Sequence, residues 1–98
     1  MKAKTRTPDP WAAAMAVTLL KDAHEIVGRL MPAPDAAPEV LRDFYLRSAK
    51  VYDRVAEVDR GHHHEALYWA KRERSKGQRI ARVLETGGDD TEEVEADE

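Results

Sequence analysis

The residues in this chain best suited to chemistry are three consecutive histidines, His62, His63 and His64, followed by Glu65. Imidazole is a common metal ligand and a general acid or base near neutral pH. Neighbouring helical residues point about 100° apart, however, so three in a row cannot face one ion. Two metal ligands on one helix are usually three or four residues apart. At that spacing His62 pairs with Glu65 and His64 with Tyr68, and neither pair makes a strong site alone. We therefore expect no metal site; the metal candidates are His62, His64 and Glu65, which His24 could join only if the fold places it nearby.

The other components of a catalytic site are missing as well. The chain has no cysteine, which excludes disulfides, thiolate zinc sites and thiol catalysis. No nucleophile motif, orienting carboxylate motif or phosphate-binding loop accompanies the histidines. We therefore expect no enzymatic activity, no catalytic residue and no cofactor. The histidines should instead begin a helix, with His63 packed under the turn that precedes it.

Large aromatic side chains form the second group of candidates. Tyr68 and Trp69 lie off the main apolar stripe of their expected helix, so each one either fills a groove between helices or remains exposed, and Trp11 and Tyr45 raise a similar question. Exposed large aromatics often mark partner-binding surfaces. The candidate partner-binding residues are Trp11, Tyr45, Tyr68 and Trp69.

A run of basic residues forms the third group. It contains a single acid, Glu73, and could neutralise several phosphates. The bases wrap around the expected helix, however, and no helix-turn-helix spacing is evident, so the alternatives are a solvated face, a nucleic-acid contact and a contact with acidic protein. These residues are Lys71, Arg72, Arg74, Lys76, Arg79 and Arg82.

Charge divides the chain into three parts. The net charge is −3, yet residues 87–98 alone hold seven acids and no base. Residues 1–86 carry twelve acids and sixteen bases, a formal charge of about +4. We expect a flexible basic arm over residues 1–8, a single domain over 9–86 and a disordered acidic tail over 87–98 that can fold back over the bases.

Periodicity predicts a first helix over about residues 10–30. Asp9 is a suitable N-cap, and Pro10 is tolerated at the first helical position, where its missing N–H has no partner to lose. A segment with three prolines follows at residues 31–38 and must be a linker. The apolar stripe of this first helix contains Trp11, Met15, Leu19, Ala23, Ile26 and Leu30 at steps of three and four.

Two longer helices should follow, over about residues 38–59 and 62–85, with Gly61 as a left-handed stop between them. The second helix has the most regular stripe, which is wide enough to touch two neighbours. This stripe contains Leu41, Phe44, Ser48, Val51, Val55 and Val58, flanked by Tyr45, Ala49, Tyr52 and Ala56. In the third helix the expected core residues are His63, Ala66, Leu67, Ala70, Gly77, Ile80, Ala81 and Leu84.

No strand pattern competes with these helices. The fold class is therefore all-α, an antiparallel three-helix arrangement in which the second and third helices form a tight hairpin. The second half of the third helix has the poorer apolar face, so it either packs less firmly or packs on another molecule.

The segment Gly61–Ala70, which reads Gly-His-His-His-Glu-Ala-Leu-Tyr-Trp-Ala, resembles the second helix of a tetratricopeptide repeat. Ala49 and Tyr52 suit the small and aromatic positions of the first helix of such a repeat. The spacing from Tyr52 to Gly61 is longer than in that family, and a long hairpin similar to microtubule-interacting-and-trafficking domains fits equally well. The composition also looks like that of small helical proteins of high-GC bacteria. The resemblance implies a helical protein-binding scaffold and no particular binding residues.

Together these features favour a small cytoplasmic, non-enzymatic module for protein–protein interaction that forms a homodimer. The alternative is a nucleic-acid-associated protein that uses the basic arm and the third helix and is autoinhibited by the acidic tail. No apolar run approaches the roughly 20 residues that a membrane span needs, so we expect no membrane partner.

Overall fold

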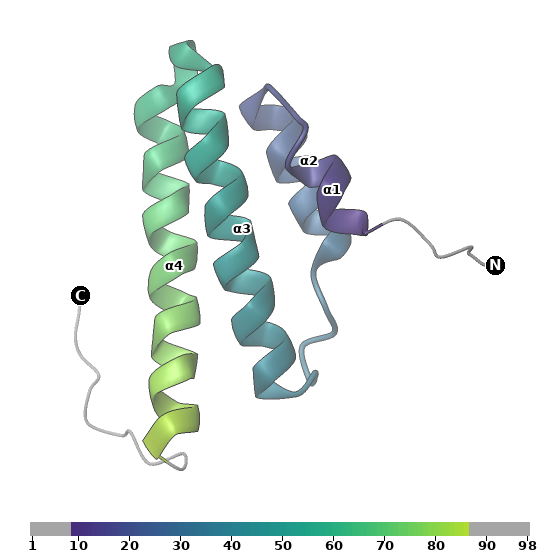
Figure 1. Cartoon of the computed structure of the whole chain (residues 1–98), viewed down its shortest axis with the longest axis vertical. Coiled ribbons are helices and arrows are strands. Elements are labelled where there is room, and N and C mark those ends of the chain that lie inside the picture. Colours follow the sequence, from purple (N-terminus) through teal and green to yellow (C-terminus); the bar gives the residue numbers. More distant parts are fainter. Residues whose placement is uncertain (1–8, 87–98) are drawn as a thin grey trace, which may run out of the picture.

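The computed structural model of the 98-residue chain describes residues 9–86. Within this range the chain forms four α-helices and one 3₁₀ turn, and it contains no strand (Figure 1). The predicted all-α class is therefore confirmed. The predicted arm over residues 1–8 and the acidic tail over 87–98 lie outside the described residues. None of the helices in residues 9–86 is both long enough and apolar enough to cross a membrane.

Helix α1 (Pro10–Ala14) begins where the sequence predicts. The Asp9 carboxylate accepts a hydrogen bond of 3.0 Å from the backbone N–H of Trp11, and Pro10 occupies the first helical position. This cap satisfies one of the amides that a helix start leaves without an internal partner. α1 nevertheless ends after five residues.

The single helix expected over residues 10–30 is wrong, because the chain leaves helical geometry before α2 (Leu20–Leu30) begins. Leu19 is extended, with φ −125° and ψ 142°. The β-branched Val17 and Thr18 precede it and favour helix less than straight-chain residues do. The break also changes the buried stripe, since α2 buries Leu20, Ala23 and Val27, whereas the predicted core residues Met15 and Leu19 are 39% and 43% exposed.

Helix α3 (Pro38–Val58) matches its predicted range closely and buries most of the predicted stripe. Two stripe residues differ, because Val58, beside the hairpin turn, is 41% exposed and Leu41, in the first turn of the helix, is half-buried. Figure 1 shows α4 along one flank of α3 and α1 with α2 along the other. A helix with neighbours on two flanks buries more than one stripe. The Ser48 hydroxyl donates to the Phe44 carbonyl oxygen (2.8 Å), which satisfies the buried polar group on this helix. The buried residues of α3 are Phe44, Ser48, Ala49, Val51, Tyr52, Val55 and Ala56.

A 3₁₀ turn, η2 (Arg60–His62), joins α3 to α4 (His63–Thr86), and the two helices form a hairpin (Figure 1). The left-handed stop expected at Gly61 is wrong, because Gly61 lies inside this turn and its φ is not positive. The chain instead leaves α3 at Asp59, with φ −99° and ψ 77°. A 3₁₀ turn is a frequent connector at a helix end and needs no glycine.

On α4 the buried side follows Ala66, Ala70, Glu73 and Gly77, at steps of four, three and four. Leu67, which we expected in the core, is 40% exposed. One residue corresponds to about 100° around a helix, so Leu67 lies beyond the edge of the side that Ala66 buries. Small residues on this side allow α3 and α4 to approach closely.

Candidate functional site

The three histidines take three different environments at the hairpin turn. Asp59 accepts a hydrogen bond from His62 Nδ1 (3.0 Å), and His63 Nδ1 donates to the carbonyl oxygen of Ala56 (2.8 Å). The structure thus places His63 under the turn, while His64 is exposed and its ring lies roughly perpendicular to that of His63 (5.1 Å between centroids).

The metal candidates His62, His64 and Glu65 are not brought together with a further ligand. Within residues 9–86, no three His, Cys, Asp or Glu side chains are grouped so that they could hold one metal ion. His62 and Glu65 do share the wall of a cavity of about 340 Å³ between α2 and the start of α4. Leu19 and Leu20 contribute apolar surface to the same wall.

Asp59 connects the hairpin turn to the start of α2. Its carboxylate accepts a hydrogen bond of 2.9 Å from the backbone N–H of Leu20, 39 residues away in the sequence. The N-cap residue Leu19 has no side-chain acceptor, so Asp59 takes the place of a local cap. The hydrogen bond from the Leu20 backbone, followed by that from His62, lowers the pKa of Asp59 below its usual range.

A cluster of ring side chains joins α2, α3 and α4. His24 Nδ1 and Tyr52 Oη lie 2.8 Å apart and share a hydrogen bond, and the edge of the Trp69 ring meets the His24 ring (centroids 4.9 Å apart). Burial, and then the nearby Glu73 carboxylate, raises the pKa of Tyr52 to about 12. The shared hydrogen bond and ring contacts of this cluster link α2 to both helices of the hairpin.

Glu73 is a buried acid at a position where the hairpin core would favour an apolar residue. Only 7% of the residue is exposed. Arg72 lies next to it, with Nε 3.8 Å from Glu73 Oε2, and the same guanidinium lies 5.3 Å from the centre of the Trp69 ring. Arg72 thus partly compensates the buried charge while covering an aromatic face.

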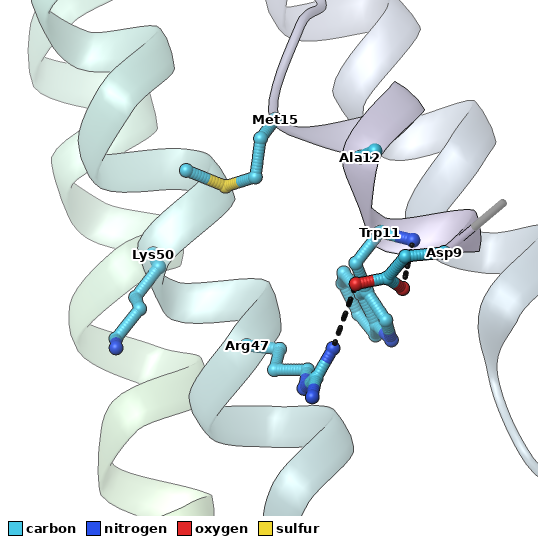
Figure 2. Close-up of a pocket in the computed structure, with 6 residues that line it drawn as sticks. All are labelled: Asp9, Trp11, Ala12, Met15, Arg47 and Lys50. Atoms are coloured by element: carbon cyan, nitrogen blue, oxygen red, sulfur yellow. Dashed lines mark hydrogen bonds and ion pairs between the residues drawn. The ribbon is translucent and has the colours of Figure 1, made fainter.

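Trp11 attaches α1 to α3 and lines a surface pocket. Its ring contacts Phe44 (5.9 Å between centroids), and Arg47 lies 5.9 Å from its centre. Figure 2 shows Arg47 reaching from α3 toward Asp9 and Trp11, whereas Lys50 points away from them. Arg47 and Asp9 form an ion pair of 3.8 Å. The pocket in Figure 2 has a volume of about 330 Å³ and is lined partly by these residues.

The four candidate partner-binding aromatics therefore do not form one patch. Trp11, Tyr45 and Trp69 are half-buried and pack against the core. Tyr45 contacts Phe44 (centroids 5.3 Å apart) and has the Lys76 ammonium 5.2 Å from its ring centre. Tyr68, beside Trp69, is 57% exposed.

Three of the six candidate bases line one side of α4. At about 100° per residue, Arg72, Lys76 and Arg79 fall within an arc of roughly 60°. We call these three residues the basic strip. Arg74 is on another side of the helix and pairs with Asp53 of α3. The remaining candidates, Lys71 and Arg82, are exposed outside the strip.

Burial within the hairpin fades toward the end of α4. Every buried residue of α4 lies between Ala66 and Gly77, and no residue from 78 to 86 is buried. Figure 1 shows that α2 lies beside the half of α3 nearest the turn and that the linker runs past the other half. We call residues 38–47 and 76–86 the open half of the hairpin. Its half-buried apolar residues include Leu41, Tyr45, Leu46, Ile80, Ala81, Val83 and Leu84.

Comparison with protein-family models, with curated proteins and with solved structures gives no match to this chain.

Sequence reasoning missed the residues that hold the helices together through polar contacts. Asp59, Asp53 and Arg47 are charged residues whose partners lie on other helices, so nothing local in the sequence identifies them. The burial of Glu73 could have been predicted from the sequence, because it lies three residues after Ala70 and four before Gly77 on the small-residue side of α4. The basic strip was also visible in the spacing of its members at steps of four and three.

Proposed function

We propose that this chain is a small non-enzymatic helical module for protein–protein interaction, and that it self-associates through the open half of the hairpin. The observation that supports the proposal is the absence of any buried residue between positions 78 and 86, even though Ile80, Val83 and Leu84 lie there. Apolar side chains left half-covered are stabilised when a second surface removes them from water.

The geometry suits a second copy of the same chain. Two copies related by a twofold axis present identical surfaces, so one half-covered face can cover another. Two open halves packed side by side would form a local four-helix bundle, a common way to complete a helical core. In this proposal the chain is an antiparallel three-helix unit in which α1 and α2 together replace the first helix. Of the four candidate aromatics, Tyr45 fits the role of anchor in this dimer best, because it lies at the border of the open half.

The proposal also includes a cytoplasmic location and a scaffold role comparable to one hairpin of a tetratricopeptide repeat. The long α3–α4 hairpin supports the scaffold role because it offers an extended helical face to a partner. Trp11, Tyr68 and Trp69 remain candidate contacts for other partners.

Sedimentation velocity over a range of concentrations tests self-association. The wild type should sediment as a dimer, and Ile80→Asp should sediment as a monomer because it would place a carboxylate in the interface. Gln78→Asp is the matched control, since Gln78 is exposed on the same helix and should leave the dimer intact. Circular dichroism establishes that both variants fold. A wild type that stays monomeric at high concentration rejects the proposal.

A second candidate function is nucleic-acid association, favoured by the basic strip and the neighbouring Tyr68 and Trp69. Bases aligned on one side of a helix can follow a phosphate backbone, and exposed aromatics can stack on bases. Fluorescence anisotropy with a labelled single-stranded oligonucleotide at low salt tests this function. Binding should weaken in the variant Arg72→Gln/Lys76→Gln/Arg79→Gln, and equal binding by that variant excludes the strip.

A further inference from the structure

The basic strip is an exposed cationic surface built on two aromatic supports. Arg72 lies over Trp69 and Lys76 over Tyr45, with cation-to-ring distances of 5.3 and 5.2 Å. Such contacts hold long flexible side chains against the protein and reduce the entropy lost when they bind an anion. Within residues 9–86, no ion pair uses Lys76 or Arg79, so their charges are free to meet an acid.

The sequence after α4 has the opposite character. Residues 87–98 carry seven carboxylates and no base, with Val94 and Ala96 as their only apolar side chains. This composition excludes them as a cover for the apolar open half, and it makes them complementary to the basic strip. We propose that residues 87–98 dock on the basic strip of the same chain, with carboxylates facing Arg72, Lys76 and Arg79.

The length of the segment permits this contact. α4 ends at Thr86, which lies 14 positions after Arg72, a distance of about 21 Å along the helix. Twelve residues can extend up to about 40 Å, so the segment reaches the far end of the strip with length to spare. Docking would require the chain to reverse direction after Thr86, and the sequence continues there with Gly87 and Gly88. Glycine adopts the backbone conformations that tight reversals need at little steric cost.

Docking in the same chain would regulate what the strip can bind. An acidic protein or a nucleic acid would have to displace the segment, whose local concentration is high because it is covalently attached. Exposed ionic contacts of this kind weaken with salt, since the screening length falls from about 10 Å at 0.1 M to about 3 Å at 1 M. The strip borders the open half, since Lys76 and Arg79 lie in both and Tyr45 contacts Lys76, but docking within one chain requires no second copy.

Paramagnetic NMR on the full chain tests the docking directly. Because the chain has no cysteine, Ala96→Cys provides a single site for a nitroxide spin label. At low salt, the label should enhance the relaxation of backbone amides around Arg72–Arg82 several-fold more than that of amides in α1. The enhancement on α4 should be lost at high salt. It should also be lost when the three strip residues are changed to glutamine.

The matched control removes three exposed cations from elsewhere, with Lys50→Gln, Arg54→Gln and Lys71→Gln, and should keep the enhancement. Equal enhancement across all exposed helices, or a pattern unchanged by neutralising the strip, overturns the proposal. A mixture of isotope-labelled protein with spin-labelled, unlabelled protein separates the two possible sources of the segment. If the relaxation enhancement in that mixture is as large as in the sample where every chain carries both labels, the segment comes from a second copy. That result overturns docking in the same chain.

Discussion

Gly77 is the residue whose missing side chain has the clearest structural use. A Cβ at this position would lie 2.6 Å from Leu46 Cδ2, 2.7 Å from Leu46 Cγ and 3.3 Å from the Leu46 backbone nitrogen. Rotation of the terminal methyl groups of Leu46 would not relieve this clash, because its Cγ is also too close and is only two bonds from the backbone. The absence of a side chain at Gly77 therefore sets how closely α3 and α4 approach at the start of the open half.

We predict that Gly77→Ala destabilises the protein by about 1–3 kcal/mol, the usual range for overpacking a tight contact, despite the better helix propensity of alanine. Urea unfolding measures the change. Gly28→Ala is the matched control, since a Cβ there has no atom within 4 Å, and it should stabilise α2 by about 0.5–1 kcal/mol. Adding Leu46→Ala should remove most of the Gly77→Ala penalty, whereas an unchanged penalty would locate the strain elsewhere.

The raised pKa of Tyr52 predicts that the protein loses stability at alkaline pH. Its pKa is about 12 in the folded chain against an ordinary value of 10, so the unfolded chain ionises first as the pH rises. The contribution of Tyr52 to the free energy of unfolding should be complete below about pH 10 and decline between about pH 10 and 12. Tyr52→Phe should lack this decline and, by losing the bond to His24, be about 0.5–1.5 kcal/mol less stable at neutral pH. Tyr68→Phe, a change at an exposed tyrosine, should retain the decline.

At the level of elements, the start of α2 depends on a carboxylate from the hairpin turn. The pKa of Asp59 is depressed, so its contribution to the free energy of unfolding is complete above its unfolded pKa and disappears as the pH falls through its folded pKa. We predict that Asp59→Asn lowers stability at neutral pH and that the difference from the wild type shrinks as the medium becomes strongly acidic. Urea unfolding from neutral to strongly acidic pH measures it. Asp35→Asn, in the linker, controls for the loss of one carboxylate, and parallel curves for wild type and Asp59→Asn would contradict the role of Asp59.

The same contact explains which elements could be predicted from the sequence. α3 and α4 were predicted within one residue at each end, because Pro38 and a long three-four stripe determine them locally. The break before α2 could not be predicted, since Leu20 obtains its cap from Asp59, 39 residues away. In the candidate site, too, local features can be predicted from the sequence and contacts between helices cannot. The spacing of the basic strip is readable in the sequence, whereas the pairing of Arg74 with Asp53 depends on how two helices meet.

At the level of the whole molecule, the lengths of the helices leave part of the core uncovered. α2 has 11 residues, while α3 has 21 and α4 has 24. At about 1.5 Å per residue, α2 is roughly half as long as either partner, so it cannot cover the full hairpin. A chain of this size has few residues with which to build a core, and association is a common way to supply the missing cover.

This incomplete cover predicts that thermal stability depends on protein concentration. If the open half is buried between two copies, mass action favours the folded dimer, and each tenfold increase in concentration adds about 1.4 kcal/mol to its stability. For a dimer of this size the thermal midpoint should rise by about 3–5 °C for each tenfold increase, as measured by scanning calorimetry. Ile80→Asp should remove the dependence, because a monomer unfolds with a midpoint that concentration does not change, and Gln78→Asp should preserve it. A concentration-independent midpoint in the wild type would instead mean that α3 and α4 are stable with their open half exposed, which contradicts self-association.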